Sequence, residues 1–313
     1  MSYTSRLSIA FILLWSTAFI AFEYCAPYVE PATFISIRVF LVSVVLLITI
    51  LVMKSSWPES WAAVFHSAVV GILIHGVYAA GSFASIHQGL SAGYCALILN
   101  LQPLLTVVLS CFFLREKITS RKLMGVIAGT AGVAVFVLDN QFANDAQLSD
   151  FGGSFQSVLL CVLALFAFTF ATIYQKRFCC NTPLTTGGFI QFFSAMIFIL
   201  PFALLFETNE IEWRLQFGFG LGWLVLGIST GAMFILMLLI KNKDAGSVAN
   251  LLYLVTPLVA IQAWILLDQS LSMTSVLGVL MCTAGVAVVN YSAPAKRRKT
   301  VYQHNRTIAF AGR

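Results

Sequence analysis

Long uninterrupted apolar runs dominate this chain, and short polar stretches separate them. A helix needs about 20 apolar residues to cross the hydrocarbon core of a bilayer. The runs are continuous and do not alternate with polar residues, which excludes a membrane β-barrel. We therefore predict an all-α integral membrane protein with ten transmembrane helices, at 7–25, 33–53, 62–83, 91–113, 123–139, 154–175, 186–206, 219–240, 246–267 and 275–292.

The composition supports this fold class. Of the 313 residues, 59% are hydrophobic and only 10% are charged. Ordinary soluble domains carry about 25% charged residues, so a soluble protein of this length would lack the charge to cover its surface. The chain is also too apolar to be intrinsically disordered.

The basic residues predict the orientation of the helices. If the N-terminus is cytoplasmic and the helices alternate, 16 of the 18 Lys and Arg residues fall on the cytoplasmic side. This is the asymmetry of the positive-inside rule, and it predicts that both termini are cytoplasmic. Six of these residues lie in the last 18 positions, so we predict a basic cytoplasmic tail at 294–313. The same distribution fits an anionic membrane surface better than a nucleic acid, and no nucleic-acid partner is expected.

An internal repeat divides the chain into two halves. The segment GVIAGTAGVAVF at 125–136 matches GVLMCTAGVAVV at 278–289, and the two lie 153 residues apart. We predict five-helix repeats at 1–140 and 150–293. Because five is odd, the two repeats enter the membrane with opposite orientation, which is typical of secondary transporters.

Several motifs allow a comparison with a known family. They are Trp15-Ser16, Pro31 and Arg38, then Ala92-Gly93, Pro103, Leu114-Arg115-Glu116-Lys117, Gly125 and Ala131-Gly132-Val133, with a second copy at Ala245-Gly246, Pro257, Gly278 and Ala284-Gly285-Val286. In this order, the motifs resemble the ten-helix EamA-type members of the drug/metabolite transporter superfamily. The resemblance covers about residues 5–292. It implies two EamA-like repeats and a substrate site among predicted helices 1, 3, 4, 6, 8 and 9. One position departs from the pattern, because the acidic residue Glu116 has only Gln269, with Asp268 beside it, in the second half.

Polar side chains precede a proline in each repeat. Asn100 and Gln102 come before Pro103, and Asn250, Tyr253 and Thr256 come before Pro257. A proline inside a helix frees a backbone carbonyl one turn earlier and loosens the helix. We interpret these side chains as substrate ligands and the two prolines as hinges. The alternative is a packing kink whose amides bond the freed carbonyls.

His75 and Tyr78 lie three residues apart and share one face of the predicted helix 62–83. Either side chain is a candidate for hydrogen bonding to a substrate, and the His75 imidazole is also a candidate proton carrier. The alternative is a buried histidine with a purely structural role.

Arg38 is the only basic residue inside a predicted helix, and Glu23 and Glu30 fall at a similar depth. An Arg38–Glu23 ion pair that breaks and reforms would act as an outer gate. A static ion pair or a snorkelling arginine is the alternative.

Four aromatic residues are candidates for an apolar lining of the site: Trp15, Phe168, Tyr174 and Trp264. Gln191 is a weaker polar candidate. Aromatic residues in membrane helices also face lipid or anchor the helix at the interface, so this assignment has an alternative as well.

The motifs that the chain lacks limit its chemistry. The predicted helices contain no cluster of acidic residues, so we expect no metal site. No Walker or HExxH motif occurs, and no interior Ser–His–Asp set is apparent, which argues against an ATP-driven pump and against an enzyme. No cofactor is expected.

Together these features predict a multi-pass transporter in a cell (inner) membrane. It would move a small organic metabolite, an amino acid or a related amine or zwitterion, outward by alternating access, with proton coupling or facilitated exchange both open. Its partners would be the substrate, the lipid bilayer and possible protons, with a monomer and a homodimer both allowed. One alternative is uptake or exchange of a larger nucleotide-like metabolite, bound by Lys241 and Lys243. Another is a non-transporting membrane scaffold or regulator that binds partners through Lys296–Lys299.

Overall fold

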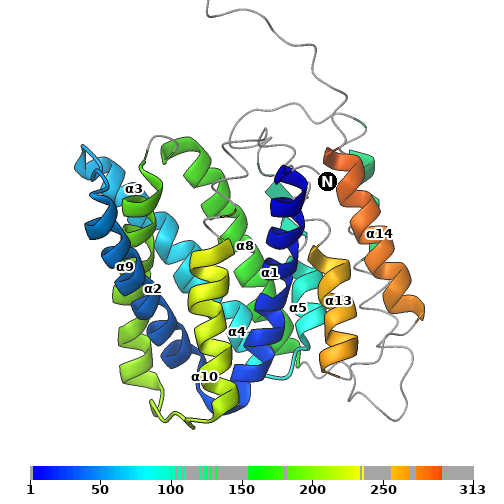
Figure 1. Ribbon diagram of the computed structural model, residues 1–313. Helices are drawn as coiled ribbons and strands as arrows, with labels where there is room; N and C mark the ends of the chain where they lie inside the picture. Colours follow the sequence, from blue (N-terminus) through cyan, green and yellow to red (C-terminus); the bar gives the residue numbers. More distant parts are fainter. Residues whose placement is uncertain are drawn as a thin grey trace, which may run out of the picture.

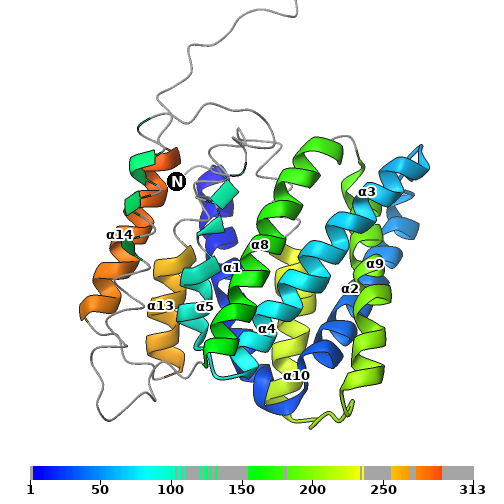
Figure 2. The same cartoon turned by 180° about the vertical axis from the view of Figure 1, so that it is seen from behind.

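The computed structural model describes 3–99, 101–102, 105–106, 109, 120, 123–125, 127–128, 131–132, 154–179, 182–232, 235, 255–267 and 273–290. In this part of the chain the helices lie side by side as one bundle (Figures 1 and 2). No β-sheet occurs among these residues, and one isolated bridge pairs Val29 with Ile211.

The helices of the first half follow one another closely. They are α1 (Tyr3–Cys25), the 3₁₀ turn η1 (Ala26–Tyr28), α2 (Pro31–Met53), α3 (Trp61–Gly71), η2 (Ile72–Tyr78), α4 (Ala79–His87) and α5 (Ala92–Leu99). The described helices of the second half are α8 (Phe155–Phe178), α9 (Leu184–Phe206), α10 (Leu215–Gly222), η3 (Trp223–Ala232), α13 (Val255–Leu266) and α14 (Met273–Asn290).

Six apolar helical spans in the described residues are long enough to cross a membrane. They are Arg6–Tyr28, Pro31–Met53, Trp61–His87, Phe155–Gln175, Leu184–Phe206 and Leu215–Ala232. Each overlaps a predicted run, although Leu215–Ala232 begins four residues before the predicted run 219–240. The all-helical membrane fold is therefore confirmed for the described residues. The other four predicted runs are described only in part, through α5, α13, α14 and a few positions between 101 and 132. The count of ten therefore stays a prediction.

Local sequence signals explain where several helices begin and end. Pro31 stands at the first position of α2, where its missing N–H costs no hydrogen bond. The Ser60 hydroxyl accepts from Ala63 N at the start of α3, and Ser154 accepts from Ser157 N at the start of α8. Lys54 adopts a left-handed conformation, φ 49°, and ends α2.

Two segments, η2 and η3, are π-helical. At the end of η2 the Ala79 N–H donates to Ile74 O, five residues earlier. Both segments interrupt otherwise apolar helices, and η3 covers the positions that lie 153 residues beyond η2. Such segments widen a helix locally and change the direction of its side chains, and they are frequent at functional sites.

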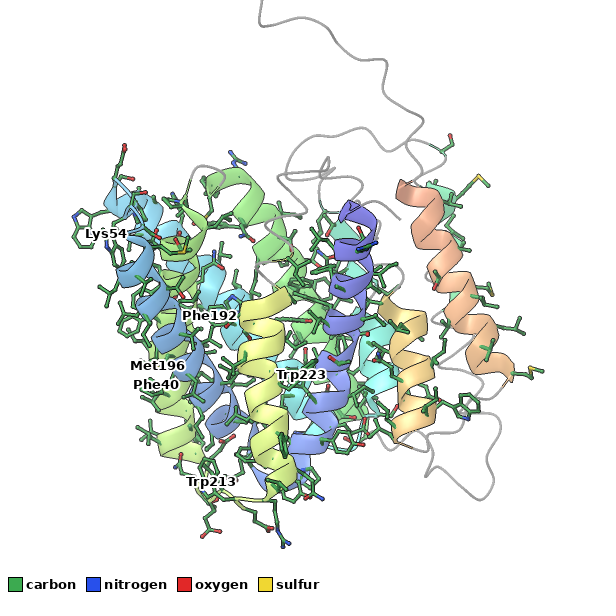
Figure 3. The ribbon with its side chains drawn as sticks, in the orientation of Figure 1. Phe40, Lys54, Phe192, Met196, Trp213 and Trp223 are labelled. Carbon is green, nitrogen blue, oxygen red and sulfur yellow. The ribbon has the colours of Figure 1, made fainter. Side chains whose placement is uncertain are left out.

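The two ends of the bundle carry opposite charge. Lys54 directly follows α2, and Arg177 is in the last turn of α8. Both lie at the end of the bundle where α1 begins and α14 finishes, which we call the basic end. Glu30, Glu207, Glu210 and Glu212 lie in the loops at the opposite end, which we call the acidic end. Lys54 and Trp213 mark these two ends in Figure 3.

The acidic end is held together by reciprocal carboxylate contacts between α2 and the loop after α9. Glu207 accepts from Ala32 N and Thr33 N, both at 2.7 Å. In return, Glu30 accepts from Thr208 N at 2.6 Å and from its hydroxyl at 2.8 Å. Each carboxylate thus satisfies backbone donors that would otherwise have no partner.

Candidate functional site

Five side chains from four elements meet inside the bundle, and we call them the central cluster. They are Phe22 of α1, Arg38 of α2, His75 and Tyr78 of η2, and Ser229 of η3. Arg38 Nη2 donates to Ser229 Oγ at 3.0 Å, and the guanidinium carbon lies 5.4 Å from the centre of the Phe22 ring. The positive charge of Arg38 is close enough to His75 and Tyr78 to interact electrostatically with both side chains.

The two π-helical segments supply three of these five residues. His75 and Tyr78 come from η2, and Ser229 comes from η3. The predicted proximity of His75 and Tyr78 therefore occurs on a widened helix rather than on a regular one. Thr230, next to Ser229, bonds back to Val225 O, five residues earlier, which fits the wider turn.

Two neighbouring helices hold the rings of the cluster in place. The Tyr78 ring stacks on Phe168 of α8, with centroids 4.5 Å apart. The His75 ring stacks on Phe192 of α9 at 3.7 Å and lies within hydrogen-bonding range of the Gln191 side chain. Phe192 lies near the middle of the height of the bundle in Figure 3. Stacking on these rings, of which Phe192 is buried and Phe168 half-buried, leaves His75 and Tyr78 little rotational freedom.

Gln102 belongs to the layer behind this cluster. Its side chain is buried, and Nε2 donates to Thr172 Oγ1 at 3.2 Å. The Thr172 hydroxyl in turn donates to Phe168 O. Gln102 is therefore connected to the turn of α8 that carries the ring behind Tyr78.

A compact group of buried aromatic rings begins at Phe22 of the central cluster and extends toward the acidic end. Phe34 stacks on Phe83 at 4.2 Å, and Phe22 meets both rings edge-on. Phe217 packs against Phe34 from α10. These four residues, the outer aromatic group, fill the space among α1, α2, α4 and α10.

The described contacts give Arg38 and Glu23 different partners. Arg38 binds Ser229, whereas Glu23 Oε2 accepts from Ala92 N at 2.7 Å, at the first residue of α5. A carboxylate at this place stabilises the positive end of the helix dipole. The ion pair of the predicted gate is thus not among the contacts described, and the gate stays a prediction.

The aromatic candidates separate in space. Trp15 is half-buried in α1, two turns from Phe22, and its ring lies 5.5 Å from that of Phe11. Tyr174 lies near the basic end, where its hydroxyl and His66 Nδ1 are 2.7 Å apart. Trp264 is 56% exposed on α13. Phe168 stacks on Tyr78, and Trp15 lies on the face of α1 that leads to the cluster. The binding roles of all four aromatic residues stay predictions.

Several predicted residues lie outside the described part of the chain. They are Asn100, Pro103, Lys241, Lys243, Asn250, Tyr253 and Lys296–Lys299. Thr256 and Pro257 are described only as backbone positions in α13. The two hinges and the polar side chains before them therefore stay predictions.

Ser229 and Phe22 were not predicted from the sequence. Ser229 is one hydroxyl in an apolar run, between Gly227 and Gly231, whose spacing indicates only close helix packing. Phe22 is one of 27 phenylalanines. Neither residue carries a signal of its own, because both depend on the position of Arg38 in another helix.

In the described residues, no group of three or more His, Cys, Asp or Glu side chains is arranged to hold a metal ion. The polar groups of the central cluster are instead a guanidinium, an imidazole, a phenol and a hydroxyl. This combination offers hydrogen bonds and one positive charge to a small organic molecule, with aromatic faces for its apolar part.

A transporter family model and several known proteins match this chain. The model of the EamA-like transporter family matches the chain twice, at 6–138 and 156–291. The Bacillus subtilis protein named "Uncharacterized transporter YvbV" is 23% identical over 304 residues, 95% of each chain. Protein PecM of Dickeya dadantii is 24% identical over 295 residues, 92% of each chain.

A shorter match carries a more specific name, and a solved structure shares the fold. A "Probable amino-acid metabolite efflux pump" of Salmonella typhimurium is 27% identical over 122 residues, 39% of this chain and 38% of that one. One crystal structure aligns with a TM-score of 0.63 and 19% identity, over 92% of this chain and 96% of that chain. Since the family model covers both halves, the protein is a multi-pass membrane transporter that belongs to the EamA-like transporter family.

Proposed function

We propose that this transporter exports a small organic metabolite, an amino acid or a related amine or zwitterion, by alternating access. The central cluster carries the proposal. It joins one buried cation to an imidazole, a phenol and a hydroxyl, and aromatic rings surround them. A compact solute with both polar and apolar parts fits such surroundings.

The relatives support the direction and the class of solute. The Salmonella protein has amino-acid metabolite efflux in its name. That match covers less than half of each chain, so the solute itself comes to this protein as part of our proposal.

Alternating access requires two related halves that exchange conformations. The proposal that the halves are inverted repeats is supported by the twofold family match. It is also supported by α2 and α9, both 23 residues long, which begin 153 residues apart. In Figure 1, α2 runs toward the basic end and α9 toward the acidic end. Helices related by an inverted repeat have this opposite direction.

In this account the outer aromatic group closes the acidic end, and the cytoplasm lies at the basic end. The solute would reach the central cluster from the cytoplasm and leave once Phe34 and Phe83 separate from Phe22 and Phe217. Gln102 and Trp15 would line the path. Proton coupling and facilitated exchange remain the two energetic options.

Efflux from whole cells tests this function. Cells that overproduce the protein are loaded with a labelled mixture of amino acids and amines, diluted, and followed for release of label. We expect at least one label to leave faster than from cells that produce an equal membrane amount of Tyr78→Ala. Equal release from both, at the rate of cells without the protein, would refute export through this site.

A further inference from the structure

Arg38 is a buried charge inside a membrane span. Its side chain is 9% exposed, and it follows Pro31 by seven residues, about 10 Å along the axis of α2. The guanidinium stays protonated in proteins. Burial of such a charge carries a high free-energy cost unless a partner compensates it.

The partners that the structure describes for Arg38 are neutral. Ser229 accepts from Nη2, and the Phe22 ring faces the guanidinium. Nε is buried and has no hydrogen-bond partner. Among the described residues, no carboxylate forms an ion pair with Arg38, so one donor of the guanidinium lacks an acceptor.

The nearby carboxylates of the described segments are engaged at the acidic end. Glu30 accepts from Thr208, and Glu207 accepts from the first residues of α2. Glu23 accepts from Ala92 N at the start of α5. These contacts are consistent with a counter-charge for Arg38 that comes from outside the protein.

The surroundings of Arg38 indicate what kind of anion fits. The rings of His75 and Tyr78 lie within electrostatic range of its charge and are held by Phe192 and Phe168. An organic molecule with one anionic group and an apolar part would match both the charge and the rings. A phosphate dianion is a poorer match, because Arg38 is the one Lys or Arg described away from the ends of the six spans.

We propose that Arg38 binds the carboxylate of the transported solute, so that this protein selects amino acids and other carboxylates over the corresponding amines. This inference rests on the proposed transport function and narrows it. The guanidinium presents a planar fork of N–H donors that matches the two oxygens of a carboxylate. The free Nε would donate to one of these oxygens.

The experiment compares matched solutes in liposomes that contain the purified protein. The lumen holds an unlabelled mixture, and the labels outside are amino acids, the primary amines left by their decarboxylation, and one phosphate monoester. We expect at least one amino acid to enter about tenfold or more faster than its amine, since charged hydrogen bonds contribute this much.

Variants then assign the selectivity to Arg38. In Arg38→Gln we expect amino-acid entry to fall about tenfold or more and the preference over amines to disappear, with partial recovery in Arg38→Lys. Arg214→Gln is the matched control, because Arg214 is exposed beside Glu212 at the acidic end and keeps only a weak surface ion pair. The control should keep both the rate and the preference.

The outcomes separate the two claims. If no label enters with the wild type, both transport of these solutes and the carboxylate inference fail. If amines enter as fast as amino acids, or the phosphate monoester enters faster than both, transport holds and the inference fails. The preference of the wild type is measured without any variant, so misfolding of Arg38→Gln does not leave the question open.

Discussion

At the scale of single residues, Gln102 shows how a buried amide can serve either structure or binding. Its Nε2 bond to Thr172 is one neutral hydrogen bond, which stabilises a protein by about 1 kcal/mol. If the bond were its only role, removal of either partner would have the same consequence. The position of Gln102 beside the turn that holds Phe168 gives it a second possible role, at the substrate.

We therefore predict different results for the two partners. Gln102→Leu should lower exchange about tenfold, because a polar contact near the substrate is lost, whereas Thr172→Val should keep exchange within about twofold. Thermal unfolding in detergent should show similar losses of stability for both. Equal transport rates in the two variants would contradict a role of Gln102 in binding.

Some residues of the site were predictable and others were not. His75 and Tyr78 were found from their spacing and Arg38 from its charge, because each is unusual in an apolar helix. The sequence could not reveal that Tyr174 pairs with His66, since that contact joins residues 108 apart. Ser229 and Phe22 were missed because their relevance comes only from the helix opposite.

At the scale of elements, the crossing of α3 and α9 depends on a residue without a side chain. A Cβ at Gly71 would overlap the backbone of Gln191. This close approach holds the segment of α9 that carries Gln191 and Phe192 against η2. The contact is thus both a packing contact and a support for His75.

We predict that Gly71→Ala lowers the free energy of unfolding by about 2 kcal/mol, the usual effect of overpacking, and slows exchange. Gly218→Ala is the matched control, since a Cβ there has no neighbour within 4 Å. The control should unfold at the same temperature or slightly above, because alanine is favoured over glycine in a helix. An unchanged melting temperature for Gly71→Ala would contradict the close approach of α3 and α9 at Gly71.

The carboxylate contacts at the acidic end provide a second test of the elements. Glu207→Ala removes three hydrogen bonds to Ala32 and Thr33 at the start of α2, and we expect a loss of about 2 kcal/mol. Glu210→Ala changes an exposed residue of the same loop and should have little effect. Equal melting temperatures for the two variants in detergent would show that the Glu207 contacts do not stabilise the bundle.

The helices themselves were largely predictable, whereas their irregular turns were not. The predicted runs 33–53 and 186–206 differ from α2 and α9 by two residues, at the N-terminal end of each. The π-helical segments η2 and η3 carry no distinct sequence pattern, because apolar residues occupy every face of a membrane helix. In the structure η2 packs against α8 and α9, and η3 packs against α1, α2 and α10, and the local sequence does not encode these contacts.

At the scale of the whole molecule, transport requires the bundle and not the basic tail. We predict that deletion of 294–313 keeps exchange within about twofold, because juxtamembrane basic residues act mainly as anchors on the anionic leaflet. Equal membrane amounts of the two proteins, measured by immunoblot, are the control. A loss of exchange in the shortened protein would assign the tail a direct role.

The most direct measurement is exchange by the purified protein in liposomes. The lumen holds unlabelled amino acids and amines, trace labels are added outside, and entry is followed with and without a pH gradient. The account predicts that at least one amino-acid label enters well above the level of protein-free liposomes, and the effect of the gradient then decides proton coupling. If none of the labels enters above that level, the proposed transport of amino acids and related amines is wrong.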